Sequence, residues 1–314
     1  EGLVGEALKD GYRERVTLAT KLPVWMVEKR EDMERFLDEQ LKRLGVDYVD
    51  VYLAHALDGK RFDTIRELGL FEFMDEMVKK GKIRYPGFSF HDEADQFRRI
   101  VDSYDWKVSQ VQMNLLDEFH QATMDGVRYA AGKGIRIVVM EPVRGGSLVK
   151  TVPDEIRALY EAAAPGRSAA EWAFRWLLDK PEFMTILSGM SDLAQADDNL
   201  RIFDSAEAGC LSEMEKETLE KVRKAYEARI RVGCTGCEYC MPCPQGIQIP
   251  RIFREYDTAS MFGDFESFRR RYNAMEVHAD ACVGCEACVA ACPQHFKTPI
   301  PEMLKQIHEE NIDK

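Results

Sequence analysis

The sequence predicts an α/β protein in which a large region of alternating strands and helices precedes a small helical region. Two observations support this prediction. Short β-branched runs alternate with amphipathic stretches over residues 1–205, and eight of the nine cysteines fall in two short runs near the C-terminus. Alternation with short connections is typical of βαβ units that share one parallel sheet. A chain of 314 residues is long enough for one large domain and one small one.

Six segments have the composition of strands that are buried on both faces of a parallel sheet. They are short runs with β-branched residues, and near-continuous apolar strands of this type suit a parallel sheet that is buried on both faces. The six segments are Val16–Thr20, Tyr48–His55, Ile83–Phe90, Lys107–Asn114, Ile135–Pro142 and Met184–Met190.

The stretches between these segments show the periodicity of amphipathic helices. Within Asp32–Leu44 the apolar residues recur on one face, and Gly45 is placed to end the helix. Gly81 and Gly134 stand between a helical stretch and the next strand, as αβ loops require. Right-handed repetition of such units either closes into a barrel or forms an open sheet.

The number of units indicates how the sheet closes. A closed barrel of this type has eight βα units, and six are visible. The sequence opens on a helical stretch, Gly2–Asp10. At roughly 30 residues per unit, about 60 residues would supply the other two. We therefore expect a (β/α)8 TIM barrel whose first two βα units lie before Glu1. The expected boundaries are the barrel at 1–205, a linking or barrel-closing helix at 206–231 and a small, mainly helical, cysteine-rich domain at 232–314.

The two cysteine runs have the spacing of iron–sulfur ligands. The run before Pro293 reads C-x2-C-x2-C-x3-C-P, the bacterial ferredoxin spacing for a [4Fe–4S] cluster, in which the fourth cysteine serves the other cluster of two-cluster proteins. The run before Pro244 has one residue fewer ahead of its last cysteine. We expect two clusters with crossed ligands. One would be held by Cys234, Cys237, Cys240 and Cys292, and the other by Cys243, Cys282, Cys285 and Cys288.

Zinc and disulfides are the alternatives for these cysteines. Zinc accepts four thiolates, but its sites usually use two well-separated CxxC pairs, whereas here cysteine recurs every third residue. Disulfides suit small secreted domains rather than a long acidic chain. Cys210 lies outside both runs and is expected to be an ordinary thiol.

The composition limits the partners and the compartment. A formal net charge of −12 argues against nucleic acid or an anionic membrane surface as a partner. No apolar run approaches the roughly 20 residues of a membrane-spanning helix, and no signal-peptide pattern opens the chain. We therefore expect a cytoplasmic protein.

Several segments, in their order and spacing, resemble the aldo-keto reductases. They cover nearly all of residues 1–205, and the chain is most similar to the subgroup that carries a C-terminal ferredoxin-type domain. The segments are VTLATKLP at 16–23, VDVYLAH at 49–55, GKIRYPGFSFH at 81–91, QVQMN at 110–114, EPVRGGSL at 141–148 and LSGMSDLAQADDNL at 187–200.

The resemblance implies hydride transfer between a nicotinamide and a carbonyl carbon, with a tyrosine as proton donor. In this family a lysine lowers the pKa of the tyrosine, an aspartate pairs with the lysine, and a histidine orients the carbonyl. Lys21 matches the lysine and His55 the histidine. We expect the aspartate and the tyrosine before Glu1, so that a chain starting at Glu1 would be inactive. Taken singly, Lys21 would read as a solvated strand cap and His55 as a packing residue.

The resemblance also implies a nicotinamide site along the strand ends. Ser89 and Gln110 match the positions that bind the carboxamide, and Met140 stands where many members stack a tyrosine on the ring. Gly145, Gly146 and Leu148 match the loop that covers the pyrophosphate, and Asn199 matches the asparagine on the adenine side. Arg144 is placed to pair with a phosphate, and Ser188 is expected to bind the cofactor as well. NADP-preferring members place a lysine and an arginine at the positions of Gly189 and Gln195, so both NADP and NAD stay open.

Three functions fit these patterns. The barrel could reduce a small carbonyl compound, or oxidise an alcohol, with the clusters serving sensing or docking. It could instead exchange electrons with the clusters and a redox partner such as a ferredoxin or flavoprotein, through a flavin. Finally, the barrel could be a non-catalytic scaffold in an electron-transfer subunit. A mediator matters because a cluster passes one electron, whereas a nicotinamide gives two electrons as hydride.

Overall fold

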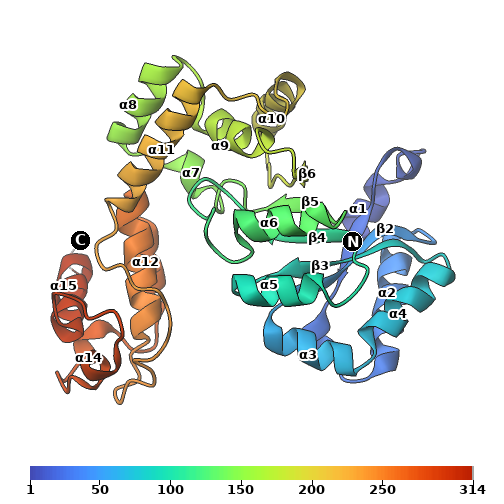
Figure 1. Ribbon diagram of the computed structural model, residues 1–314. Coiled ribbons are helices and arrows are strands. Elements are labelled where there is room, and N and C mark those ends of the chain that lie inside the picture. The colour runs from blue at the N-terminus through green and yellow to red at the C-terminus, as the bar shows by residue number, and fades with distance from the viewer. Residues whose placement is uncertain (313–314) are drawn as a thin grey trace. The chain divides into compact units, whose positions relative to one another are not determined.

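The computed structural model describes residues 1–312 and divides the chain into two compact units (Figure 1). The first unit comprises Glu1–Gly145 with Ala173–Leu211, and the second comprises Gly146–Trp172 with the chain from Ser212 onward. Segment 146–172 therefore groups with the cysteine-rich part, although it precedes the last strand. The predicted boundaries at 205 and 231 stay a prediction.

The first unit is built on a six-stranded parallel sheet in the order β1-β2-β3-β4-β5-β6. Strictly sequential order is that of a barrel wall, since an open doubly wound sheet reverses its strand order. The six predicted strands are confirmed, with ends that differ by a few residues. They are β1 (Ala19–Leu22), β2 (Val49–Leu57), β3 (Ile83–Phe90), β4 (Val108–Gln112), β5 (Arg136–Met140) and β6 (Phe183–Ile186).

Close strand packing explains one glycine of the sheet. Gly87 pairs with Val108 across β3 and β4, and a Cβ at this position would lie 2.4 Å from the Val108 carbonyl oxygen. A side chain at position 87 would therefore push the two strands apart.

Helices connect the strands as the periodicity predicts. α2 buries Met33, Phe36, Leu37, Leu41 and Leu44, and Gly45 ends the helix with a left-handed φ of 68°. Around the sheet, α5 and α6 pack against each other (Figure 1). The helices of this unit are α1 (Gly2–Ala7), α2 (Arg30–Leu44), α3 (Gly59–Glu67), α4 (Leu70–Lys79), α5 (Ala94–Val101), α6 (Thr123–Gly132) and α10 (Leu193–Ser205), and α9 (Ala169–Leu178) spans the division between the units.

The second unit is helical, as predicted. α11 begins at a capping box formed by Ser212 and Glu215 and packs against α8. The aromatic residues between the cysteine runs form a buried core, which includes Phe253, Tyr256, Phe268 and Tyr272. Its helices are α7 (Ser147–Lys150), α8 (Asp154–Ala163), α11 (Glu213–Glu227), α12 (Ile249–Phe262), α13 (Phe265–Asn273), α14 (Ala287–Ala291) and α15 (Ile300–Ile312).

Within residues 1–312, the structure contains no helix with the length and apolar character needed to cross a membrane.

Candidate functional site

Lys21 and His55 lie on adjacent parallel strands. Lys21 is in β1, where it pairs in register with Leu53 of β2, and His55 follows two residues later on β2. The carboxyl ends of parallel strands meet at one edge of a sheet, where barrel enzymes place their chemistry.

A buried hydrogen-bond chain fixes the backbone at Lys21. The side-chain amide of Gln40 on α2 donates to the Lys21 carbonyl oxygen at 2.8 Å, and the Tyr52 hydroxyl donates to Oε1 of Gln40 at 2.9 Å. Gln40 and Tyr52 are both buried. Partial burial also lowers the pKa of the Lys21 ammonium, since a low-dielectric surrounding disfavours the charged form.

His55 is held in a neutral form by its surroundings. Its ring lies against Trp25, with the ring centroids 5.0 Å apart. Burial lowers the pKa of His55, and the positive charges of Lys21, His91 and Arg61 lower it further. A neutral imidazole carries one N–H donor and one acceptor nitrogen, which suits it to orient a carbonyl oxygen.

Ser89 on β3 supports the end of β2. Its side chain is almost fully buried, and its Oγ accepts a hydrogen bond from the Ala56 backbone N–H at 2.8 Å. Ala56 has a φ of 53°, in the left-handed region that residues with a side chain rarely adopt. The Ser89 hydroxyl thus stabilises the strained backbone directly after His55, in the irregular last part of β2.

Gln110, in the middle of β4, contacts Met140, the last residue of β5. The Gln110 side-chain amide donates to the Met140 sulfur at 3.1 Å. Gln110 and Met140, two of the residues expected at the nicotinamide site, therefore lie in contact, and the thioether occupies one of the amide's donors.

A polar cluster beside these residues was missed at the level of sequence. The buried Asp117 accepts hydrogen bonds from Gln112 Nε2 and Asn114 Nδ2, both at 2.8 Å, and Arg144 Nε lies 4.0 Å from its carboxylate. Asn114 Nδ2 also donates to the Glu141 carbonyl oxygen at 3.0 Å. The run of polar residues after β4 could have indicated this cluster, but a search for apolar periodicity takes no account of polar residues.

The glycine loop after β5 adopts backbone angles that favour glycine. Gly145 and Gly146 have φ values of 62° and 90°, and Leu148 is buried. Gly145 belongs to the first unit, whereas Gly146 and Leu148 belong to the second.

The residues after β6 form a local hydrogen-bonded group. Asn199 Nδ2 donates to Ser188 Oγ at 2.9 Å, and Oε1 of Gln195 accepts from the Ser191 backbone N–H at 3.0 Å. Gly189 and Gln195 are exposed. The structure thus brings Ser188 and Asn199 into direct contact.

The cysteines line two cavities in the second unit. The narrower cavity, of about 10 Å³, has Cys234, Cys237, Cys240 and Cys292 in its wall together with Ile249 and Phe253.

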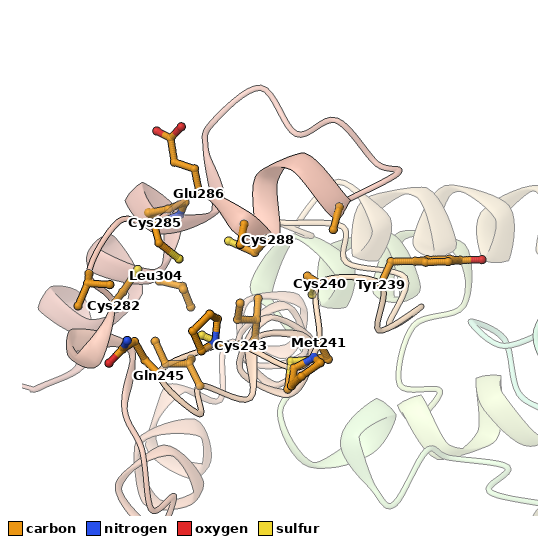
Figure 2. A pocket seen from close by; sticks show the side chains of 18 residues that line it. Tyr239, Cys240, Met241, Cys243, Gln245, Cys282, Cys285, Glu286, Cys288 and Leu304 are labelled. Carbon is orange, nitrogen blue, oxygen red and sulfur yellow. The ribbon is translucent and has the colours of Figure 1, made fainter.

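The wider cavity, of about 140 Å³, is lined by Cys240, Cys243, Cys282, Cys285 and Cys288. Figure 2 shows the last four of these around one space, whereas Cys240 lies to one side near Tyr239. Apart from the shared Cys240, the two cavities separate the cysteines into the same two sets as the crossed hypothesis.

The donor chemistry fits a metal-containing group. All nine cysteines are free thiols. Burial raises the pKa of Cys234 and Cys288, and it raises the pKa of Cys240 to about 11. Thiols in such surroundings need a cation before they ionise, and a bound metal deprotonates them.

A single metal ion fits the arrangement less well than a cluster does. Among the residues that the structure describes, no group of three or more His, Cys, Asp or Glu side chains could hold one metal ion. A cubane spreads its four thiolates over separate iron corners, and the sulfurs around the wider cavity suit it.

Comparison with known proteins decides the family. A model of the Aldo/keto reductase family matches residues 1–224. The chain belongs to this family. A second model, described as a 4Fe-4S dicluster domain, matches residues 233–296. The predicted combination of an aldo-keto reductase with a C-terminal iron–sulfur domain is therefore confirmed, and the chain is an oxidoreductase of the aldo-keto reductase type.

Curated relatives of this aldo-keto reductase are about a quarter identical to it over the aligned part of the chain. A 6-dehydroglucose reductase of Novosphingobium aromaticivorans is 28% identical over 227 residues, which is 66% of this chain and 69% of the relative. An L-galactose dehydrogenase of Arabidopsis thaliana is 24% identical over 63% of this chain and 65% of its own length. An NADH-specific methylglyoxal reductase of Escherichia coli K12 is 25% identical over 70% of this chain and 80% of its own.

Solved structures agree on the fold. The holo form of aldo-keto reductase AKR11C1 from Bacillus halodurans matches with a TM-score of 0.59 at 22% identity, covering 70% of this chain and 77% of that one. The thermostable aldo-keto reductase Tm1743, in complex with the inhibitor epalrestat, matches with a TM-score of 0.56 at 26% identity, covering 70% and 76%. The six sequential strands are thus those of an aldo-keto reductase barrel.

Proposed function

We propose that the barrel interconverts a small carbonyl compound and its alcohol with NADP or NAD, and that the C-terminal domain carries two [4Fe–4S] clusters. The observation that carries the first part is the placement of Lys21 and His55 on adjacent strands of an aldo-keto reductase sheet. The second part is supported by the two cysteine-lined cavities.

In this proposal His55 binds and orients the substrate carbonyl. The lowered pKa of His55 keeps its imidazole neutral at neutral pH, so that its N–H can donate to the carbonyl oxygen. The backbone of Lys21 is fixed through Gln40. Its positive charge would favour loss of a proton from the tyrosine that serves as proton donor in this family. Trp25 lies against His55 and keeps water from one side of its ring.

The nicotinamide supplies the hydride when it is bound. Ser89 and Gln110 would hold its carboxamide, with Met140 against the ring. Arg144 and the loop of Gly145, Gly146 and Leu148 would hold the phosphates, and Ser188 and Asn199 the adenine side. Gly189 and Gln195 offer no cation to a 2′-phosphate, which supports use of NAD as well as NADP.

The crossed ligand sets are the proposed cluster sites. Cys234, Cys237, Cys240 and Cys292 would hold one cluster around the narrow cavity. The other four cysteines would hold the second cluster around the wider cavity. Cys237 and Cys285 are exposed, so each cluster would have an edge open to a redox partner protein.

The substrate class follows from the chemistry of the relatives. Their names describe a dehydroglucose, a galactose and methylglyoxal, all small carbonyl compounds or sugars. Small, oxygen-rich carbonyl compounds are therefore the first substrates to test.

A second candidate function is an electron-transfer subunit in which the barrel serves as a scaffold. Met140 in place of the stacking aromatic residue and the absence of cations at positions 189 and 195 favour it. These positions weaken the match to a tight nicotinamide site.

One anaerobic experiment distinguishes these functions. Full-length, cluster-loaded protein is mixed with NADH or NADPH, with and without a panel of small aldehydes, and followed by visible absorption and EPR. Nicotinamide consumed only with a carbonyl present, and clusters left unbleached, would support the reductase with an accessory iron–sulfur domain. Bleaching by nicotinamide alone would mean that electrons pass between the cofactor and the clusters. If neither change occurred, the scaffold would be favoured and the proposed reductase activity would be wrong.

A further inference from the structure

A buried acid lies beside the first cysteine run without belonging to the proposed chemistry. Asp257 on α12 is only 8% exposed. Its carboxylate accepts hydrogen bonds from three consecutive backbone N–H groups, those of Arg231 at 3.0 Å, Val232 at 2.7 Å and Gly233 at 2.9 Å. The next residue is Cys234. The acid therefore fixes the chain immediately before the first proposed ligand.

The same helix fixes the chain one step further upstream. The Ser260 hydroxyl donates to the Arg229 carbonyl oxygen at 2.8 Å. Nε of Arg229 donates in return to the carbonyl oxygens of Ser260 at 3.2 Å and Met261 at 2.9 Å. Segment 229–233, which leads from α11 to the first cysteine run, is thus held along the second half of α12.

The first half of α12 forms part of the cavity wall. Ile249, Pro250 and Phe253 line the narrow cavity with the cysteines. Asp257 follows Phe253 by four residues, so the two side chains lie on the same helix face, one turn apart.

We infer that Asp257 is a positioning residue for the cluster of Cys234, Cys237, Cys240 and Cys292, and that its charge lowers the reduction potential of that cluster. Reduction adds an electron, and a fixed negative charge nearby opposes it. Net charge and hydrogen bonding near the sulfurs are established determinants of cluster potential. The inference rests on the two clusters of the proposed function. It deepens that function because it names the cluster whose reduction potential is lowered by a nearby charge.

The test compares Asp257→Asn with Asp257→Glu in the holoprotein. Both variants and the unmodified protein are reconstituted anaerobically, analysed for iron and sulfide, and titrated with EPR detection. Cys237→Ser identifies the signal of the affected cluster. Asp264→Asn is the matched control, because Asp264 is another acid of the same domain that accepts a backbone hydrogen bond, from Ser267 at 3.1 Å, at the start of α13.

Asp257→Asn is expected to keep both clusters and to shift one midpoint to a more positive potential, while the other midpoint stays. Asp257→Glu and Asp264→Asn are expected to leave both midpoints in place. Loss of only the cluster that Cys237 serves, in Asp257→Asn, would also support positioning at that site. Unchanged midpoints in Asp257→Asn, an equal shift of both, or loss of both clusters would overturn the inference. If the unmodified protein bound no iron and sulfide, the proposed function would fail instead.

Discussion

Gln110 donates a hydrogen bond from its side-chain amide to the thioether sulfur of Met140, 3.1 Å away, and so links the middle of β4 to the end of β5. A thioether sulfur is a weak hydrogen-bond acceptor, so the Gln110 amide would bind a stronger acceptor, such as a carbonyl oxygen, more favourably. The pair stands where the family resemblance expects a carboxamide contact and an aromatic ring. Nicotinamide binding would therefore displace this contact.

Met140→Tyr is expected to tighten binding of NADH and NADPH by roughly 2- to 10-fold, because stacked aromatic pairs contribute about 0.5–1.5 kcal/mol beyond area burial. Quenching of protein fluorescence on titration with each nucleotide measures the dissociation constants. Met140→Leu keeps an apolar side chain of similar volume and should bind like the unmodified protein. Equal affinity in the tyrosine variant would mean that position 140 does not face the ring.

His55 predicts a pH dependence of stability. Its pKa in the folded protein is lowered, first by burial and then by Lys21, so folding favours the neutral imidazole. This contribution is fully present above the usual histidine pKa of about 6.5 and is lost as the pH falls through the lower folded value. We expect the melting temperature of His55→Gln to fall less than that of the unmodified protein between pH 7 and pH 5.

Thermal melts at closely spaced pH values check this expectation. His120→Gln serves as the control, since His120 is an exposed histidine in the loop after β4. Parallel curves for His55→Gln and the unmodified protein would show that His55 titrates alike in the folded and unfolded states.

The buried hydrogen-bond chain from Tyr52 through Gln40 to the Lys21 carbonyl oxygen predicts that Tyr52→Phe loses stability. Removal of the hydroxyl leaves Oε1 of the buried Gln40 without its donor, which costs about 1–3 kcal/mol in the free energy of unfolding. Urea denaturation measures the change. Tyr85→Phe removes a hydroxyl from a partly exposed tyrosine on the neighbouring strand and should change stability by less than about 0.5 kcal/mol. Similar free energies of unfolding for the two variants would mean that this hydrogen-bond chain contributes nothing to stability.

Local patterns explain which parts of the fold could be predicted. The predicted range of β3, Ile83–Phe90, coincides with the observed strand because a short segment rich in apolar and aromatic residues, with a glycine before it, is a local signal. β1 instead starts at Ala19 rather than Val16. Leu18, just before it, directs its carbonyl oxygen to the backbone N–H groups of Asp50 and Val51, a contact between distant segments that composition does not encode.

The candidate site also has a part that local sequence patterns predict and a part that they do not. The grouping of cysteines around two cavities follows ligand spacing, which is written within a few residues of sequence. Gln40 and Asp257 were not predicted, because each acts on a backbone segment 19 or more positions away through hydrogen bonds that only the folded chain creates. Polar residues on helices are ordinarily read as solvated, and burial alone reveals these two.

Crossed cluster ligation predicts opposite effects for the last cysteine of each run. In a background with serine at Cys282, Cys285 and Cys288, only one [4Fe–4S] cluster can form, with about four irons per chain. If the ligands are crossed, adding Cys292→Ser should abolish this cluster, whereas adding Cys243→Ser should leave it intact. Iron and sulfide analysis with EPR after anaerobic reconstitution measures both. The reverse result would assign each run to its own cluster, and the common wall of Cys234, Cys237, Cys240 and Cys292 around the narrow cavity would then be a packing contact rather than a ligand set.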